Sequence, residues 1–207
     1  MPQRIILIGG GGQCKSAIPI IASHDYFLDG IMDGAEHIGK TCAGVPFKYT
    51  DDQMEGLAKD FHFVITVGQT PVNNPTGRKR IFTRLKAIGA SILTIQSKCA
   101  IVHGYLSEGA FIHDFAVVNV DSVIGENTII NTAAIVEHDA QIGSHCHICP
   151  GAIVLGGISI ASDTIIGAGS VVVAPITEPG FYAGVPARPI MTTERIIKPK
   201  IHVGGMN

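Results

Sequence analysis

A six-residue repeat runs through the second half of the chain and limits what that half can fold into. Stepping by six from residue 100 to residue 172 meets an aliphatic side chain at twelve of thirteen positions. The residue four places further on is small at eleven of thirteen positions. A period of six suits neither an amphipathic helix nor an alternating strand, but it suits a triangular coil with one flat face per hexapeptide.

Three hexapeptides would make one coil, with the aliphatic residue pointing into a prism and the small residue at a corner. The spacing shows no slip between residues 100 and 172, so we expect no inserted loop there. Gly125, Gly143 and Gly167 each follow an aliphatic position, where we expect tight corners. The sequence therefore predicts a parallel β-helix over residues 96–190, followed by a C-terminal tail over 191–207.

The first half of the chain alternates strand and helix patterns. "RIILIGGGG" predicts a buried strand that enters a glycine turn, and a helix follows despite Pro19. "DYFLDGIMDG" predicts a second strand, residues 62–68 a third, "TGRKRIFTRLKAIG" a helix, and "SILTI" a closing strand. This order predicts a Rossmann-like, parallel α/β domain over residues 1–95.

The glycine turn is a candidate phosphate site, because glycines let backbone N–H groups and a helix N-terminus approach a phosphate closely. It does not match the P-loop pattern, and a tight turn without a ligand is the alternative interpretation. Asp33 follows about twenty residues later, the spacing at which nucleotide folds use an acid against a ribose hydroxyl.

Charge and composition exclude several other classes of function. The formal net charge is −2 and the 15 basic residues form no long run, so nucleic acid is not an expected partner. No stretch approaches 18 uninterrupted apolar residues, so we expect no membrane span. The first residues lack the pattern of a signal peptide, which predicts a cytoplasmic protein. Five cysteines is an odd number and argues against a complete disulfide framework.

The order of the two halves, together with "NTAAIVEHD" and "YAGVPARPI", resembles the sialic-acid O-acetyltransferase and nucleotide 4-amino-sugar N-acetyltransferase family of hexapeptide-repeat acyltransferases. The resemblance covers about residues 3–190. It implies a left-handed β-helix, acetyl-CoA as co-substrate, and a homotrimer in which the acyl-CoA site lies between two prisms.

The function that this resemblance implies is N-acetylation of the 4-amino group of a UDP- or dTDP-linked 4-amino-4,6-dideoxysugar, for surface glycan biosynthesis. Two alternatives stay open at this point. One is O-acetylation of a sialic-acid-like sugar, and the other is a sugar-nucleotide-binding scaffold without catalysis.

His138 is the candidate base, because a histidine has a pKa near neutrality and can take the proton of an attacking amine. By resemblance, Asp139 supports it. Glu137 suits that role less well, since side chains one apart on a strand face opposite ways.

The remaining site residues are also implied by resemblance. Those for the sugar nucleotide are Gly10, Gly11, Gly12, Gln13, Asp33, Gly68 and Gln69. Those for acetyl-CoA are His147, as a donor near the acetyl carbonyl, together with Gly156, Ala168, Gly169 and Arg188.

The sequence also departs from the family. Gln13 and Gln96 stand where relatives usually have histidine, and residues 70–77 look like an added loop. "HCHICP" offers soft ligands in Cys146, His147 and Cys149. The repeat already explains Cys146 as a corner residue, so no metal is expected. A zinc carbonic anhydrase on the same prism would pair histidines five residues apart, and none of the nine here stand so.

Overall fold

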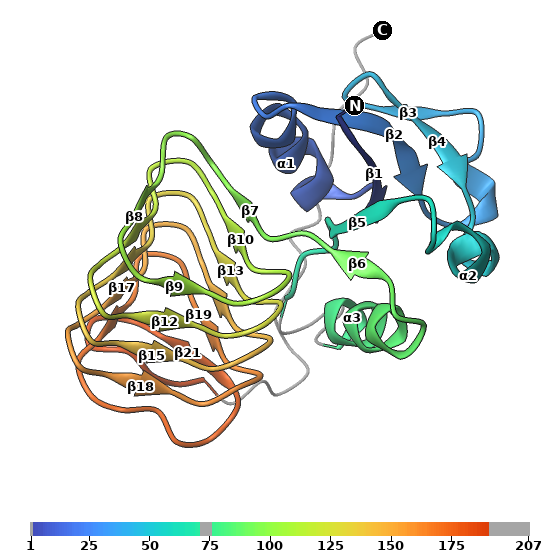
Figure 1. The fold of residues 1–207 in the computed structure, drawn as a ribbon. Helices are drawn as coiled ribbons and strands as arrows, with labels where there is room; N and C mark the ends of the chain where they lie inside the picture. The colour runs from blue at the N-terminus through green and yellow to red at the C-terminus, as the bar shows by residue number, and fades with distance from the viewer. Residues whose placement is uncertain (1, 71–75, 191–207) are drawn as a thin grey trace, which may run out of the picture.

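A computed structural model describes residues 2–70 and 76–190. The predicted tail at 191–207 and most of the segment 70–77 lie outside these residues. The described residues form an α/β sheet domain and a triangular prism side by side (Figure 1).

The N-terminal sheet has the strand order β3-β4-β2-β1-β5-β6. All neighbours pair in parallel except β3 with β4. Its strands are β1 (Gln3–Ile8), β2 (Tyr26–Met32), β3 (Thr41–Cys42), β4 (Val45–Tyr49), β5 (His62–Ile65) and β6 (Ser91–Ile92). The hairpin of β3 and β4 was not predicted, and β6 is shorter than the predicted closing strand, since Ile95 already belongs to the prism.

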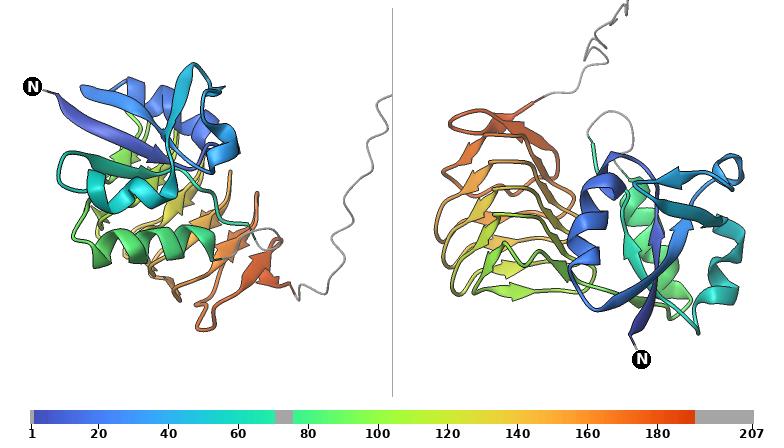
Figure 2. Two further views of the ribbon diagram at one scale, coloured as in Figure 1. Left: turned by 90° about the vertical axis from the view of Figure 1, so that its right-hand side faces the viewer. Right: turned by 90° about the horizontal axis from the view of Figure 1, so that it is seen from above.

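Helices cover both faces of this sheet. They are α1 (Gly12–Ala22), α2 (Met54–Leu57) and α3 (Gly77–Ala87), with two short 3-10 helices, η1 (Ala35–His37) and η2 (Asp51–Gln53). One apolar cluster joins α1 to the sheet and to the prism, and a second joins α2 and α3 to the other face. Figure 2 shows α1 between the sheet and the prism. No helix within the described residues is long and apolar enough to cross a membrane.

The prism is a stack of coils with three parallel sheets as its faces. Face 1 comprises β7 (Ile95–Gln96), β10 (Phe111–Ile112), β13 (Ile129–Ile130), β16 (His147–Ile148), β19 (Ile165–Ile166), β21 (Phe181–Ala183) and β22 (Arg188–Pro189), of which β22 is antiparallel. Face 2 comprises β8 (Ile101–Val102), β11 (Val117–Val118), β14 (Ile135–Val136), β17 (Ile153–Val154) and β20 (Val171–Val172). Face 3 comprises β9 (Tyr105–Leu106), β12 (Val123–Ile124), β15 (Gln141–Ile142) and β18 (Ser159–Ile160).

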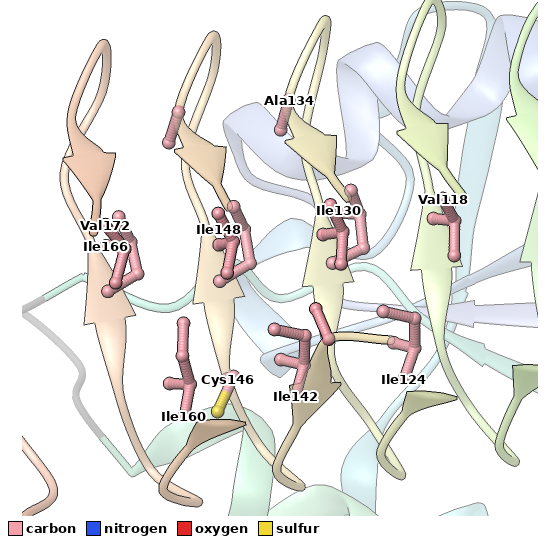
Figure 3. Packing of buried hydrophobic residues seen from close by; sticks show 14 of the residues in the cluster. Val118, Ile124, Ile130, Ala134, Ile142, Cys146, Ile148, Ile160, Ile166 and Val172 are labelled. Atoms are coloured by element: carbon pink, nitrogen blue, oxygen red, sulfur yellow. The ribbon is translucent and has the colours of Figure 1, made fainter. Parts of the chain in front are cut away.

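The aliphatic position of the repeat fills the inside of the prism, as predicted. Figure 3 shows these side chains stacked coil upon coil, with Cys146 and Ala134 at small positions among them. The predicted parallel β-helix is therefore confirmed, and its coils fit the left-handed class.

The predicted register is wrong at the first step of the repeat. Val118 pairs with Val102 and not with Ala100, because the corner at 103–104 is two residues short. From Leu106 to Val172 the partners are 18 residues apart, as in Leu106 with Ile124, and in the last coil they are 16 apart, as in Ile166 with Tyr182.

The glycines predicted at tight corners have another role. Left-handed backbone conformations fall two residues further on, as at Asn127 and His145, and not at Gly125 or Gly143. A Cβ on Gly125 would lie 2.6 Å from the backbone of Gly143 in the next coil. These glycines are needed because neighbouring coils approach closely there.

Candidate active site

The pair His138 and Asp139 lies at a prism corner, between faces 2 and 3. Nδ1 of His138 is 2.7 Å from Oδ2 of Asp139, and the two side chains are 60% and 63% exposed. Asp139 has a φ of 59°, so the chain turns there and the two neighbouring side chains meet. Glu137 instead accepts a hydrogen bond of 3.0 Å from Asn119.

The hydrogen bond to Asp139 raises the pKa of His138. An Nδ1–H that donates to the carboxylate leaves Nε2 as the basic nitrogen. No residue of the described chain forms a hydrogen bond with that Nε2. The arrangement can therefore accept a proton at Nε2 from a group that arrives from solvent.

Gly156 lies against this imidazole, one coil further along the prism. A Cβ on Gly156 would be 2.7 Å from both Cε1 and Nε2 of His138. The amide of Gly157 donates to the carbonyl of His138 at 2.8 Å. The missing side chain at 156 thus leaves room for the ring in its position beside Asp139.

The glycine loop lies at the carboxyl end of β1. Strand β1 lies between β2 and β5 in the sheet. The connection from β1 to β2 and the later connection to β5 therefore lead to opposite sides of β1, and a crevice forms at such a switch point. The amide of Gly10 donates to Asp33 Oδ2 at 2.7 Å, and the amide of Gly34 donates to Oδ1 at 2.8 Å. Asp33 therefore shapes the loop directly.

The other predicted nucleotide residues gather around this loop. A Cβ on Gly11 or on Gly12 would meet no atom within 4 Å, so the start of α1 is open to a ligand. A Cβ on Gly68 would lie 3.6 Å from Cβ of Gln13. Gln69 is buried.

Two prism histidines connect the prism to the N-terminal domain, and the sequence indicated neither connection. Nε2 of His113 is 2.7 Å from the Gln13 amide nitrogen. Nδ1 of His147 is 2.8 Å from the carbonyl oxygen of Gln69, and its Nε2 is 3.0 Å from the Asn131 amide nitrogen. Burial lowers the pKa of each histidine to about 4, so both rings are neutral at pH 7.

His147 forms part of the contact between the two domains, and its role toward acetyl-CoA stays a prediction. Its ring is buried between the prism and the N-terminal domain, with a partner at each nitrogen. In this arrangement it has no N–H free to stabilise an acetyl oxyanion.

Arg78 is a second link between the domains that sequence reasoning missed. Its side chain is fully buried, and its guanidinium donates to the carbonyl oxygens of Ile65, Asn127 and Gly109. The first of these ends β5, and the other two belong to prism corners. Burial lowers the pKa of Arg78, yet at about 9 it still favours the charged form at neutral pH.

The acetyl-CoA candidates do not meet in one chain. Ala168 and Gly169 are exposed at the corner between faces 1 and 2, whereas Gly156 lies at the corner between faces 2 and 3. Arg188 is exposed in β22, near the end of the described residues. A single chain thus presents three separate groups: the glycine loop, the His138 corner, and the corner with Ala168.

The metal interpretation of "HCHICP" finds no geometric support. Burial raises the pKa of Cys146 to about 12 and that of Cys149 to about 11, which favours the neutral thiols. Residues 2–70 and 76–190 contain no group of three histidine, cysteine or acidic side chains that could hold a metal ion.

Known proteins match both the repeat and the two-domain arrangement. Residues 121–156 and 139–174 match the family model described as bacterial transferase hexapeptide (six repeats). No curated protein sequence matches the chain.

Solved structures are similar over nearly the whole chain. The acetyltransferase domain of PglB from Neisseria gonorrhoeae FA1090 is 25% identical, with a TM-score of 0.78 over 91% of this chain and 100% of that domain. A variant of GDP-perosamine N-acetyltransferase from Caulobacter crescentus, in complex with CoA and GDP-perosamine, is 27% identical, with a TM-score of 0.76 over 90% of this chain and 96% of that one.

A third structure, WeeI from Acinetobacter baumannii AYE, is 19% identical and shows the fold alone, with a TM-score of 0.61 over 91% of this chain and 100% of that one. The matched repeats, the prism and the acetyltransferase neighbours together show that the chain is an acyltransferase built on hexapeptide repeats.

Proposed function

We propose that this chain transfers an acetyl group from acetyl-CoA to the 4-amino group of a nucleotide-linked 4-amino-4,6-dideoxysugar, for surface glycan biosynthesis in the cytoplasm. The observation that carries the proposal is the 2.7 Å contact of His138 Nδ1 with Asp139, which leaves Nε2 available as a base. The Neisseria and Caulobacter neighbours, one named an acetyltransferase domain and the other an amino-sugar N-acetyltransferase, support the class of reaction.

The chemistry follows from that pair. As the amine nitrogen bonds to the thioester carbonyl carbon, Nε2 of His138 takes a proton from the amine. Asp139 favours the imidazolium that forms. When the C–S bond breaks, coenzyme A leaves and takes up that proton as a thiol, so the base is regenerated.

The N-terminal domain would bind the nucleotide in a Rossmann-like manner. Open amides at Gly11 and Gly12, at the start of α1, suit a diphosphate, and Asp33 suits a ribose hydroxyl. UDP and dTDP are the predicted nucleotides. GDP belongs in any test, because the Caulobacter structure contains GDP-perosamine.

The active site needs two copies of the chain. The N-terminal domain covers face 1, through contacts such as His147 with Gln69, whereas His138 lies on the corner between faces 2 and 3. In Figure 1, strands of face 2 such as β8 and β17 lie on the side turned away from that domain. A sugar bound at the glycine loop of one chain would therefore meet His138 of a neighbouring chain.

The apolar surface of face 2 supports a homotrimer. Its outward row is aliphatic in every coil and is not fully buried in the single chain: Ile101, Val117, Ile135, Ile153 and Val171. If face 2 faces a threefold axis, the His138 corner of each prism abuts the Ala168 corner of the next. The three separate groups would then line one cleft.

A screen of acetyl-CoA consumption tests the reaction. The panel holds 4-amino-4,6-dideoxysugars linked to UDP, dTDP or GDP, together with free sialic acids. Turnover with one amino-sugar nucleotide is expected. Turnover with sialic acids alone would contradict N-acetylation and favour the O-acetyltransferase alternative. Binding of nucleotides without any turnover would favour the non-catalytic scaffold.

Subunit complementation tests the shared site. Gly11→Asp introduces a carboxylate that repels a diphosphate without a clash in the fold, and His138→Ala removes the base. Each variant alone should be inactive. In randomly mixed trimers about one quarter of the sites combine an intact loop with an intact His138, so about one quarter of wild-type activity should return. Mixtures that stay inactive would contradict a site shared between chains.

A further inference from the structure

Phe115 has a backbone conformation that bulky side chains rarely adopt. Its φ is 61°. The other hexapeptides with a positive φ at the equivalent position hold only Ala, Asp, Asn, His or Gly there: Gly109, Asp121, Asn127, Ala133, Asp139, His145, Gly151, Gly157, Asp163 and Gly169. Asn, Asp and Gly tolerate positive φ, whereas a phenylalanine there is strained.

Burial does not explain this phenylalanine either. Its side chain is 67% exposed, so the ring contributes little to the core. At the same corner of the following coils, the equivalent residues are Ala133, Gly151 and Gly169. The ring therefore projects from an edge whose next positions are small.

The corner that carries Phe115 is fixed to the glycine loop. His113, two residues earlier, is buried and its Nε2 lies 2.7 Å from the Gln13 amide nitrogen. Asp114 accepts a hydrogen bond from Ser97. The amide of Ala116 donates to the carbonyl of His113 at 3.3 Å. The exposed ring of Phe115 thus extends from a strained backbone position, and hydrogen bonds hold this corner on the prism side of the glycine loop.

We propose that Phe115 is a stacking platform for the sugar ring of the nucleotide-linked substrate, an inference that rests on the proposed function. The loop amides suit the diphosphate, and Asp33 suits the ribose, which lies on the nucleoside side. The sugar must extend from the diphosphate toward the prism, where Phe115 lies. A deoxysugar has apolar C–H faces and a methyl group, which an aromatic face can cover.

Phe115→Asn separates this role from a structural one. Asparagine relieves the backbone strain, so Tm should rise by roughly 2–4 °C. The KM for the amino-sugar nucleotide should rise roughly 3–10-fold, because the aromatic contact is lost. The Kd of the free nucleoside diphosphate should change by less than about twofold. Phe115→Tyr, which keeps the ring, should retain the wild-type KM.

Phe27→Asn is the matched control, since Phe27 is 52% exposed and lies at the amino end of β2, away from the loop. It should leave the KM unchanged. An unchanged KM in Phe115→Asn would overturn the proposal. So would an equal loss of affinity for the free nucleotide, a fall in Tm, or dissociation to monomers by sedimentation. Absence of turnover in the wild type with every amino-sugar nucleotide would instead refute the proposed function itself.

Discussion

Faces 1 and 2 of the prism have outward rows of similar apolar character, yet only face 1 is covered within the chain. The outward row of face 1 is buried at Ile95, Phe111, Ile129, His147 and Ile165. No outward residue of face 2 is fully buried, and face 3 turns polar at Gln141 and Ser159. The inward residues of the repeat specify the prism, whereas the outward residues indicate what each face packs against.

Polar contacts distinguish the covered face further. On the face 1 side, the buried groups of His147 and Arg78 have partners in both domains. A buried polar group without a partner would destabilise the fold, so these contacts fix how the two domains dock. Face 2 presents aliphatic side chains, which suit a copy of the same surface.

The largest expected effect comes from a charge on face 2. Ile135→Glu places a carboxylate in the middle of the outward row, where a trimer would bury it without a partner. We expect monomers by sedimentation and a loss of turnover of at least about 10²-fold, because no complete site remains. The matched control is Gln141→Glu on face 3, which should leave the trimer intact. An active, trimeric Ile135→Glu protein would contradict the assembly through face 2.

Removing the base separates chemistry from assembly. His138→Ala should lower kcat by roughly 10²–10⁴-fold while the protein stays trimeric. The inward neighbours Val136 and Ile142 are untouched, so the prism should keep its circular dichroism spectrum. The defect should shrink as pH rises, because the amine substrate then loses its proton without help. Near-wild-type turnover at neutral pH would leave His138 as a positioning residue at most.

Asp33→Ala should act on the nucleotide side alone. The carboxylate holds the amides of Gly10 and Gly34, and a ribose hydroxyl would be a further partner. We expect the KM of the sugar nucleotide to rise roughly 10–100-fold, as for loss of a charged hydrogen bond. The affinity for acetyl-CoA should stay nearly unchanged. Equal losses for both substrates would mean that Asp33 supports the fold.

The covered face should make the fold sensitive to acid. Burial lowers the pKa of His113 and of His147 to about 4, against an ordinary value near 6.5. Between these values the unfolded chain binds more protons than the folded one. The contribution of each ring to the free energy of unfolding is complete above about pH 6.5 and falls as pH drops toward 4; at pH 5 the loss is roughly 2 kcal/mol for each ring.

Urea unfolding at pH 7.5 and at pH 5 measures this loss, and His147→Leu should reduce the pH dependence. Stability that is equal at the two pH values in the wild type would show that the rings are not held neutral.

Much of the prism could be predicted because its inward residues follow a strict period. The meeting of His138 with Asp139 depends on a positive φ at Asp139, and the same corner position also holds Asp121 and Asn127, residues that tolerate it. The sequence could not place His147, since its outward position on β16 does not tell whether another domain covers it. The role of Gly125 could not be predicted either, because the sequence does not show how closely neighbouring coils approach each other.

The smallest expected effect concerns the carboxylate beside the base. Asp139→Asn keeps a side chain of the same shape but removes the charge that raises the pKa of His138. The base must be neutral to act, so activity falls below its pKa. Since the variant lowers that pKa, the acidic limb of the kcat/KM profile should move to lower pH. The maximal rate should fall less than in His138→Ala, because the imidazolium that forms loses one favourable partner but the base itself remains. A profile whose acidic limb stays in place, or moves to higher pH, would mean that the 2.7 Å contact does not control the base.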